Sequence, residues 1–187
     1  MPVNRARVRE SGARKRAVAG GKAITLSHID RDGAARMVDV STKETTAREA
    51  QASAEVKLKP AVLDLLMQGG LPKGDALAAA RLAGIMAAKR TADWIPLCHP
   101  LSLDWVQIDF SRTARGVLQI LCTARTTGRT GVEMEALTGA TASALTIYDM
   151  TKAADKSIVI GPVQLERKTG GKSGSYTRQP RDSRARR

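Results

Sequence analysis

The sequence predicts an α+β sandwich, in which helices pack on one face of a mostly antiparallel sheet. Residues 50–59 alternate between apolar and polar side chains, which is the pattern of a strand with one buried face. Residues 76–90 and 133–152 consist mostly of good or neutral helix formers. The predicted elements follow in the order strand, strand, helix, helix, strand, strand, helix, strand. Together, the order and the alternation favour a sheet with its helices on one side.

The first half of the chain contains two predicted strands followed by two helices. A short strand is predicted at 37–41, before the alternating one. Pro60 suits the first turn of a helix, and Gly69-Gly70 is typical of its end. Asp75 can cap the next helix, because its carboxylate accepts hydrogen bonds from the free N–H groups of a first turn.

The second half begins with a loop and continues with a predicted hairpin. Residues 94–100 contain two prolines, which disfavour helix and restrict their neighbours, so we expect a stiff, extended loop. Residues 106–110 and 117–122 alternate like paired strands, and an Arg-Gly pair lies at the turn between them. A last strand is predicted at 157–163, interrupted by a Gly-Pro pair.

The positive charge is concentrated at the two ends of the chain. The net charge of +13 divides into +6 for residues 1–23, +4 for residues 175–187 and the remaining 13 − 6 − 4 = +3 for residues 24–174. We therefore expect one folded domain at 24–174 between two disordered basic tails. A solubilising role for the tails is favoured over non-specific polyanion binding. The alternative function is a nucleic-acid-binding protein that uses these tails.

Composition excludes several classes of protein. Aromatic residues make up only 3% of the chain, too few for a base-stacking platform. Two cysteines cannot build a disulfide framework or a four-thiolate zinc site, so we expect a cytoplasmic protein with no metal and no cofactor. No apolar run approaches the ~20 residues that cross a membrane. The Arg-rich N-terminus leaves an organelle transit peptide as the alternative.

One face of the helix at 133–152 carries two groups suited to acid–base chemistry. At about 100° per residue, Asp149 and Lys152 share a stripe with Thr138, Ala142 and Leu145. An ordinary surface ion pair is the simpler interpretation. The small or apolar neighbours favour catalysis instead, because partial burial would shift both pKa values toward neutrality.

Two further segments carry candidate binding groups. Glu133-Met134-Glu135 stands where carboxylates stabilise a helix start, and its carboxylates could also accept hydrogen bonds from a purine or pterin edge. Cys98-His99 lies in the stiff loop, where His99 is either a buried structural imidazole or a site residue. The sequence offers no second His/Cys cluster, so we exclude zinc.

Several lysines suggest a polyanionic small substrate. The segment 168–174 resembles a phosphate loop but fails the Walker pattern, because Glu166 stands where the first glycine is required. It is either a flexible linker or an anion cradle formed by Lys168, Lys172 and exposed backbone N–H groups. Lys73 in a loop and Lys89 at a helix end add further cations.

Seven segments of the chain together form a recognisable pattern, at residues 37–41, 71–75, 88–91, 95–100, 130–138, 145–150 and 168–174. Its most specific parts are the Leu-Cys-His-Pro and Gly-Val-Glu-Met-Glu motifs. Together, these segments resemble one family, the cyclic pyranopterin monophosphate synthases (MoaC). The similarity covers residues 25–174 in the right order and leaves both tails out.

The resemblance implies a ferredoxin-like fold and a homohexamer, a trimer of dimers, with sites at subunit interfaces. It implies conversion of 3′,8-cyclo-7,8-dihydro-GTP into cyclic pyranopterin monophosphate and pyrophosphate, in molybdenum cofactor biosynthesis. No membrane or specific nucleic acid is expected as a partner. A regulatory subunit without chemistry is disfavoured by the intact Asp149 and Lys152. By motif position, the catalytic residues would be Asp149, Lys152 and Lys73, and the substrate-binding residues would be Leu97, Cys98, His99, Glu133, Met134, Glu135, Lys89, Lys168 and Lys172.

Overall fold

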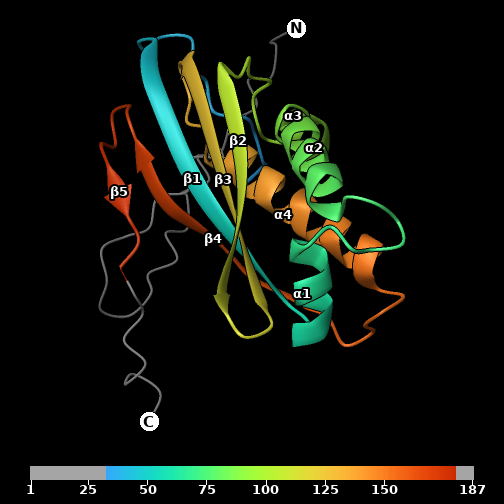
Figure 1. Ribbon diagram of the computed structural model, residues 1–187. Coiled ribbons are helices and arrows are strands. Elements are labelled where there is room, and N and C mark those ends of the chain that lie inside the picture. The colour runs from blue at the N-terminus through green and yellow to red at the C-terminus, as the bar shows by residue number, and fades with distance from the viewer. Residues whose placement is uncertain (1–32, 180–187) are drawn as a thin grey trace, which may run out of the picture. The chain divides into compact units, whose positions relative to one another are not determined.

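A five-stranded antiparallel sheet with the strand order β2-β3-β1-β4-β5 forms the framework of the fold (Figure 1). The computed structural model describes residues 33–179. β1 lies at the centre of the sheet and pairs with β3 on one side and β4 on the other. The strands are β1 (Thr46–Lys57), β2 (Trp105–Ala114), β3 (Val117–Gly128), β4 (Val159–Thr169) and β5 (Tyr176–Thr177).

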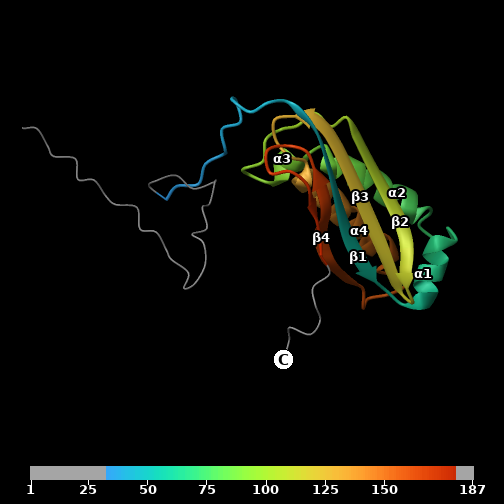
Figure 2. The same cartoon turned by 90° about the vertical axis from the view of Figure 1, so that its left-hand side faces the viewer.

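Helices cover one face of this sheet. The long helix α4 packs on β1, β3 and β4, and α2 packs on α4 and β2. Figure 2 shows both helices behind the strands, so the opposite face of the sheet carries no helix among the described residues. The predicted α+β class is therefore confirmed. The helices are α1 (Pro60–Met67), α2 (Ala76–Ala88), α3 (Thr91–Trp94) and α4 (Glu133–Thr151).

The core is built from small side chains on β1. Ala50, Ala52, Ala54 and Val56 all face the helices and are at most 1% exposed, as the alternation of the sequence predicts. Their partners on β3 are equally buried, so two adjacent strands present one continuous apolar surface to α4. Because alanine projects little beyond the backbone, α4 can lie close to the sheet.

Two glycines let the helices pack closely. A Cβ on Gly84 of α2 would collide with the Ser143 hydroxyl of α4. A Cβ on Gly139 of α4 would lie 2.7 Å from the Sγ of buried Cys122 in β3. The Ser143 hydroxyl instead donates a hydrogen bond of 3.0 Å to the Ala80 carbonyl, which joins the two helices. This three-layer contact fixes α4, whose two ends carry most of the candidate site residues.

Most predicted elements are confirmed, with three corrections. The strand expected at 37–41 is absent, because the Asp39 carboxylate accepts a hydrogen bond from the Ser41 N–H and turns the chain. The stiff loop expected at 94–100 begins with the last residue of α3, a one-turn helix. The last strand is longer than expected: β4 runs to Thr169, and its pairing with β1 shifts register at the predicted Gly-Pro pair.

Residues 39–179 belong to one compact unit, whereas residues 33–38 belong to a separate one. The predicted tail at 1–23 lies outside the described residues, as does 180–187 of the predicted C-terminal tail. Between Gly174 and that segment, β5 pairs with β4. Among the described helices, none is long and apolar enough to cross a membrane.

Candidate functional site

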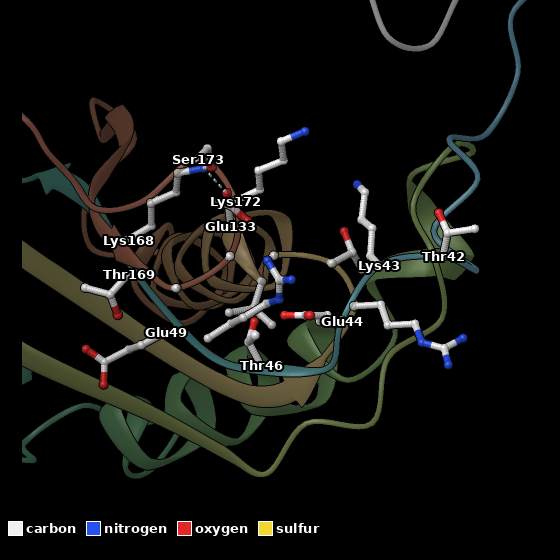
Figure 3. Close-up of a pocket in the computed structure, with 17 residues that line it drawn as sticks. Thr42, Lys43, Glu44, Thr46, Glu49, Glu133, Lys168, Thr169, Lys172 and Ser173 are labelled. Carbon is white, nitrogen blue, oxygen red and sulfur yellow. Dashed lines mark hydrogen bonds and ion pairs between the residues drawn. The ribbon is translucent and has the colours of Figure 1, made fainter.

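An open pocket of about 950 Å³ lies at the N-terminal end of α4 (Figure 3). Its walls come from the segment that enters β1, the segment between β3 and α4, and the loop that follows β4. Three of the predicted site residues, Glu133, Lys168 and Lys172, line it. The structure thus brings together groups that stand 39 positions apart in the sequence, between 133 and 172.

A half-buried ion pair fixes the centre of this pocket. The Lys168 ammonium donates hydrogen bonds to the Glu133 carboxylate at 2.8 Å and to the Ser173 hydroxyl at 3.1 Å. A Cβ on Gly131 would collide with the Glu133 carboxylate, so glycine leaves the room this carboxylate occupies. Lys168 is therefore held in place before any ligand arrives, which lowers the entropic cost of binding one.

The loop after β4 is shaped by glycine at its contact with β1. Gly171 has φ +75°, and a Cβ there would collide with the Arg48 guanidinium. Arg48 in turn donates from Nε to the Gly128 carbonyl at 2.9 Å. A larger residue at position 171 would therefore strain the backbone and push the Arg48 guanidinium aside, so glycine is favoured there.

The charges of the pocket favour an anionic ligand. Five cationic and three acidic side chains line it. Two of the acids are already neutralised, because Glu133 pairs with Lys168, and Glu49 pairs with Arg167 at 2.6 Å and with Arg125 at 2.5 Å. Such a surplus of fixed cations in a concave site attracts and holds polyanions. The five cations are Lys43, Arg48, Arg129, Lys168 and Lys172.

The predicted catalytic residues form a second group at the opposite end of α4. The Lys152 ammonium lies 2.7 Å from Oδ1 of Asp149, and the Lys73 ammonium lies 3.9 Å from Oδ2. Lys73 also donates a hydrogen bond of 3.0 Å to the Asp149 carbonyl. The loop between α1 and α2 thus places Lys73 against the last turns of α4, as the similarity to the family implies.

This group is exposed, which differs from the expected partial burial. The stripe on α4 passes from buried Thr138 and Ala142 to exposed Leu145, Asp149 and Lys152. Ile147 and Thr151 in the same turns are buried, so the stripe here lies on the outward face of the helix. The hydrogen bond and charge of Lys152 lower the pKa of Asp149, and the charge of Lys73 adds to this. The same hydrogen bond raises the pKa of Lys152.

A buried carboxyl, Glu135, lies next to the pocket residue Glu133, in the first turn of α4. Burial raises the pKa of Glu135 to about 7, and the negative charge of Glu133 contributes to the increase. The pKa of the Cys98 thiol is also raised, by burial and by the negative charge of Glu135. The Leu-Cys-His-Pro segment therefore lies near Glu135.

The remaining predicted site residues belong to neither the pocket lining nor the Asp149 group. Leu97, His99 and Met134 are all half-buried, in the two segments that meet near Glu135. Lys89 forms the C-cap of α2 and is exposed, and it does not line the pocket. Within residues 33–179, no group of His, Cys, Asp or Glu side chains is arranged to hold a metal ion.

Sequence reasoning missed three cations of the pocket. Lys43 and Arg48 flank the start of β1, and Arg129 precedes the Thr-Gly-Val-Glu-Met-Glu segment. Their positions in the sequence, close to the family segments 37–41 and 130–138, could have indicated that they belong to the site. Their convergence depends on how β1 pairs with β3 and β4, which no local pattern reveals.

The two groups are too far apart to act on the same atoms within one chain. Asp149 follows Glu133 by 16 residues of the same helix, which corresponds to about 24 Å at 1.5 Å per residue. Reacting atoms must approach to within about 3–3.5 Å of the groups that act on them. One chain therefore holds an anion pocket and a separate Asp–Lys–Lys group.

These features define an α+β protein with an open pocket whose charges suit an anionic ligand. Residues 37–171 match the model of the MoaC family. The cyclic pyranopterin monophosphate synthase of Streptomyces coelicolor is 61% identical over 153 residues, which cover 82% of this chain and 89% of that protein. The synthase of Herpetosiphon aurantiacus is 59% identical, with 81% and 93% covered. Synthase 1 of Mycobacterium tuberculosis is 54% identical, with 86% and 94% covered. The chain belongs to the MoaC family.

Proposed function

We propose that this protein converts 3′,8-cyclo-7,8-dihydro-GTP into cyclic pyranopterin monophosphate and pyrophosphate, a step in molybdenum cofactor biosynthesis. It is then a lyase whose substrate is a small, highly charged nucleotide derivative. The observation that carries the proposal is the pocket of five cations around the Lys168–Glu133 pair, in a chain of this family. The substrate carries a triphosphate, and such a pocket fits it.

The pocket is proposed to hold the phosphates and to stabilise the leaving group. Formation of a cyclic phosphate is an internal attack by a hydroxyl on phosphorus, and pyrophosphate departs with the bonding electron pair. Fixed cations stabilise the charge that develops on the departing oxygens. Lys168 is already oriented by Glu133, whereas Lys43 and Lys172 extend from the rims of the pocket (Figure 3).

Asp149, Lys152 and Lys73 are proposed to move protons while the purine-derived ring opens and a pterin ring closes. At neutral pH, Asp149 is ionised and Lys152 is protonated, because each lowers the free energy of the other's charged form. Asp149 can accept a proton and Lys152 can donate one. Burial would bring both pKa values closer to neutrality, where proton transfer is most efficient.

We further propose that the complete site forms between two copies of the chain. The distance of about 24 Å along α4 prevents one copy from supplying both groups to one substrate. In a closed oligomer, the Asp149 end of one copy can meet the pocket of its neighbour, which would bury Asp149 and Lys152. A homohexamer, arranged as a trimer of dimers, is the assembly proposed here.

Glu135 and the Leu-Cys-His-Pro segment are proposed to recognise the ring system. A carboxyl with a pKa near 7 can accept a hydrogen bond when ionised and donate one when protonated, so it can follow a ring that changes its own protonation. Leu97, Cys98, His99 and Met134 would line the rest of this region. We place the protein in the cytoplasm, since both cysteines are free thiols.

The direct test supplies the cyclised dihydro-GTP to wild type, to Asp149→Asn and to the control variant Asp109→Asn. Asp109 is an exposed aspartate on β2, remote in sequence from either group. We expect pyrophosphate and the pterin product from wild type and the control, and a loss of at least 100-fold in kcat for Asp149→Asn. A folded wild-type oligomer that releases no pyrophosphate would contradict the proposed function.

A further inference from the structure

The loop that carries Lys172 and Ser173 belongs to a hairpin with a very short second strand. β4 ends at Thr169, the chain turns through three glycines, and β5 returns along β4 for two residues. Lys168 pairs with Tyr176, and Arg167 pairs with Thr177. An edge strand of two residues has too few ladder bonds to stay paired by itself. Some other contact must hold the returning chain in place.

Arg178 supplies that contact immediately after β5. Its backbone N–H donates a hydrogen bond of 2.7 Å to the Glu166 carbonyl, which extends the pairing by one step. Its Nε donates a hydrogen bond of 2.7 Å to the Leu165 carbonyl. The guanidinium also lies 3.7 Å from Oε2 of Glu166. The Arg178 side chain thus adds two contacts with β4 to the one that its backbone makes.

Glu166 is aimed at Arg178 by an irregularity in β4. Gln51 of β1 pairs with Arg167 and the next residue, Ala52, pairs with Leu165, so Glu166 is the extra residue of a β-bulge. Bulges redirect side chains and occur often beside functional sites. The other oxygen of Glu166 accepts a hydrogen bond of 2.5 Å from the hydroxyl of Ser53, which is 2% exposed. Glu166 is thereby anchored to the central strand.

The pocket depends on the position of this hairpin. Lys168 is the last residue but one of β4, and the Ser173 hydroxyl accepts a hydrogen bond from it. Lys172 and Ser173 both line the pocket, and neither lies in a regular element. Their positions are therefore set from two sides: by Thr169 at the start of the loop and by β5 at its end.

We propose that Glu166 and Arg178, which we call the C-terminal clamp, are positioning residues for the anion pocket. The clamp holds β5 on β4 and so keeps the Lys172–Ser173 loop closed over Lys168. This inference rests on the proposed function in one respect only, namely that the ligand of the pocket carries phosphate groups. The segment that composition assigns to a basic tail then has a structural role as far as Arg178.

The test compares Arg178→Ala with Arg184→Ala, which removes the same charge beyond the described residues. Hydrogen exchange of the amides of residues 172–178 measures how firmly the loop and β5 are held. Calorimetric titration measures the affinity of the pocket for pyrophosphate. We expect Arg178→Ala to exchange these amides at least tenfold faster and to bind pyrophosphate about tenfold more weakly. Arg184→Ala should match wild type in both. Arg178→Lys should be intermediate, because lysine retains the ion pair but not the fork of donors.

Glu166→Gln provides a second, nearly isosteric route to the same result. Its amide oxygen can still accept the Ser53 hydrogen bond, while the charge opposite Arg178 is lost. We expect faster amide exchange and weaker pyrophosphate binding, as in Arg178→Ala. In turnover assays, KM should rise by a larger factor than kcat falls. Loop amides and pyrophosphate affinity unchanged in both Arg178→Ala and Glu166→Gln would overturn the clamp.

Hydrogen exchange separates this inference from the proposed function, because it needs no substrate. Absent turnover by wild type, together with faster exchange in Arg178→Ala, would reject the function and support the clamp. Normal turnover by wild type, with unchanged exchange in both variants, would support the function and reject the clamp.

Discussion

The two ends of helix α4 differ in how far each is organised within a single chain. At the N-terminal end, Lys168 and Glu133 are about three-quarters buried, and glycines shape the surrounding loops. At the C-terminal end, Asp149 and Lys152 are more than half exposed and are held only by each other and by Lys73. Exposed ion pairs contribute little to stability and are screened by salt. The first end is ready to bind an anion, whereas the second needs a covering surface before it can transfer protons efficiently.

The largest effect is expected from Lys168→Ala at the organised end. Removing this cation leaves Glu133 unpaired and half-buried in the pocket, so the remaining charge repels phosphate. We expect kcat/KM to fall by about 100- to 1,000-fold. Steady-state pyrophosphate release measures this. Lys57→Ala, which removes an exposed lysine at the far end of β1, should retain wild-type activity, and an equal loss there would point to non-specific electrostatics.

The next largest effect is expected on the pH dependence of the free energy of unfolding, to which Glu135 contributes. Burial raises the folded-state pKa of this carboxyl to about 7, so the folded state favours its protonated form. Stability therefore falls as the pH rises from the unfolded-state pKa to about 7, and levels off above that. The decrease should be roughly 3 kcal/mol between pH 4 and pH 8. Urea unfolding at several pH values measures it. In Glu135→Gln this decrease should disappear, whereas Glu55→Gln should keep it.

A smaller effect is expected from Gly171→Ala, with Gly69→Ala as its matched control. Both glycines have positive φ, +75° and +70°, but an added Cβ meets Arg48 at position 171 and nothing at position 69. Both variants should lose about 1 kcal/mol of stability from backbone strain. Only Gly171→Ala should also bind pyrophosphate more weakly, by about tenfold. Equal pyrophosphate affinity in the two variants would show that the contact between loop and Arg48 is unimportant.

The smallest effect is expected on stability at the exposed end. The depressed pKa of Asp149 contributes stability only above its ordinary titration range, and this is lost as pH falls through the lower folded-state value. Because the pair is exposed within one chain, Asp149→Asn and Lys73→Ala should leave the unfolding temperature of the dissociated chain at its wild-type value at pH 7. A decrease of several degrees would mean that the group already supports the fold.

The sequence predicted those features that local rules determine. The Asp75 carboxylate accepts a hydrogen bond of 2.9 Å from the Ala78 N–H, as its place before α2 predicted, and the alternation of β1 identified its buried face. The placement of Lys73 beside Asp149 followed from the similarity to the family. Arg48 and Arg129 were not predicted, because strand pairing alone brings them to the pocket. Asp149 and Lys152 form the exposed ion pair that the sequence left open as the simpler interpretation, and the partial burial that favoured catalysis is not present in the single chain.

The most direct test of a site shared between two copies is complementation of inactive variants. Asp149→Asn retains an intact pocket, and Lys168→Ala retains an intact Asp149, so a mixed oligomer can assemble complete sites from different subunits. We predict that co-expressed, differently tagged variants, purified through both tags, regain about one quarter of wild-type turnover, as random mixing across an interface requires. Mixed oligomers that stay as inactive as either variant alone would contradict the shared site.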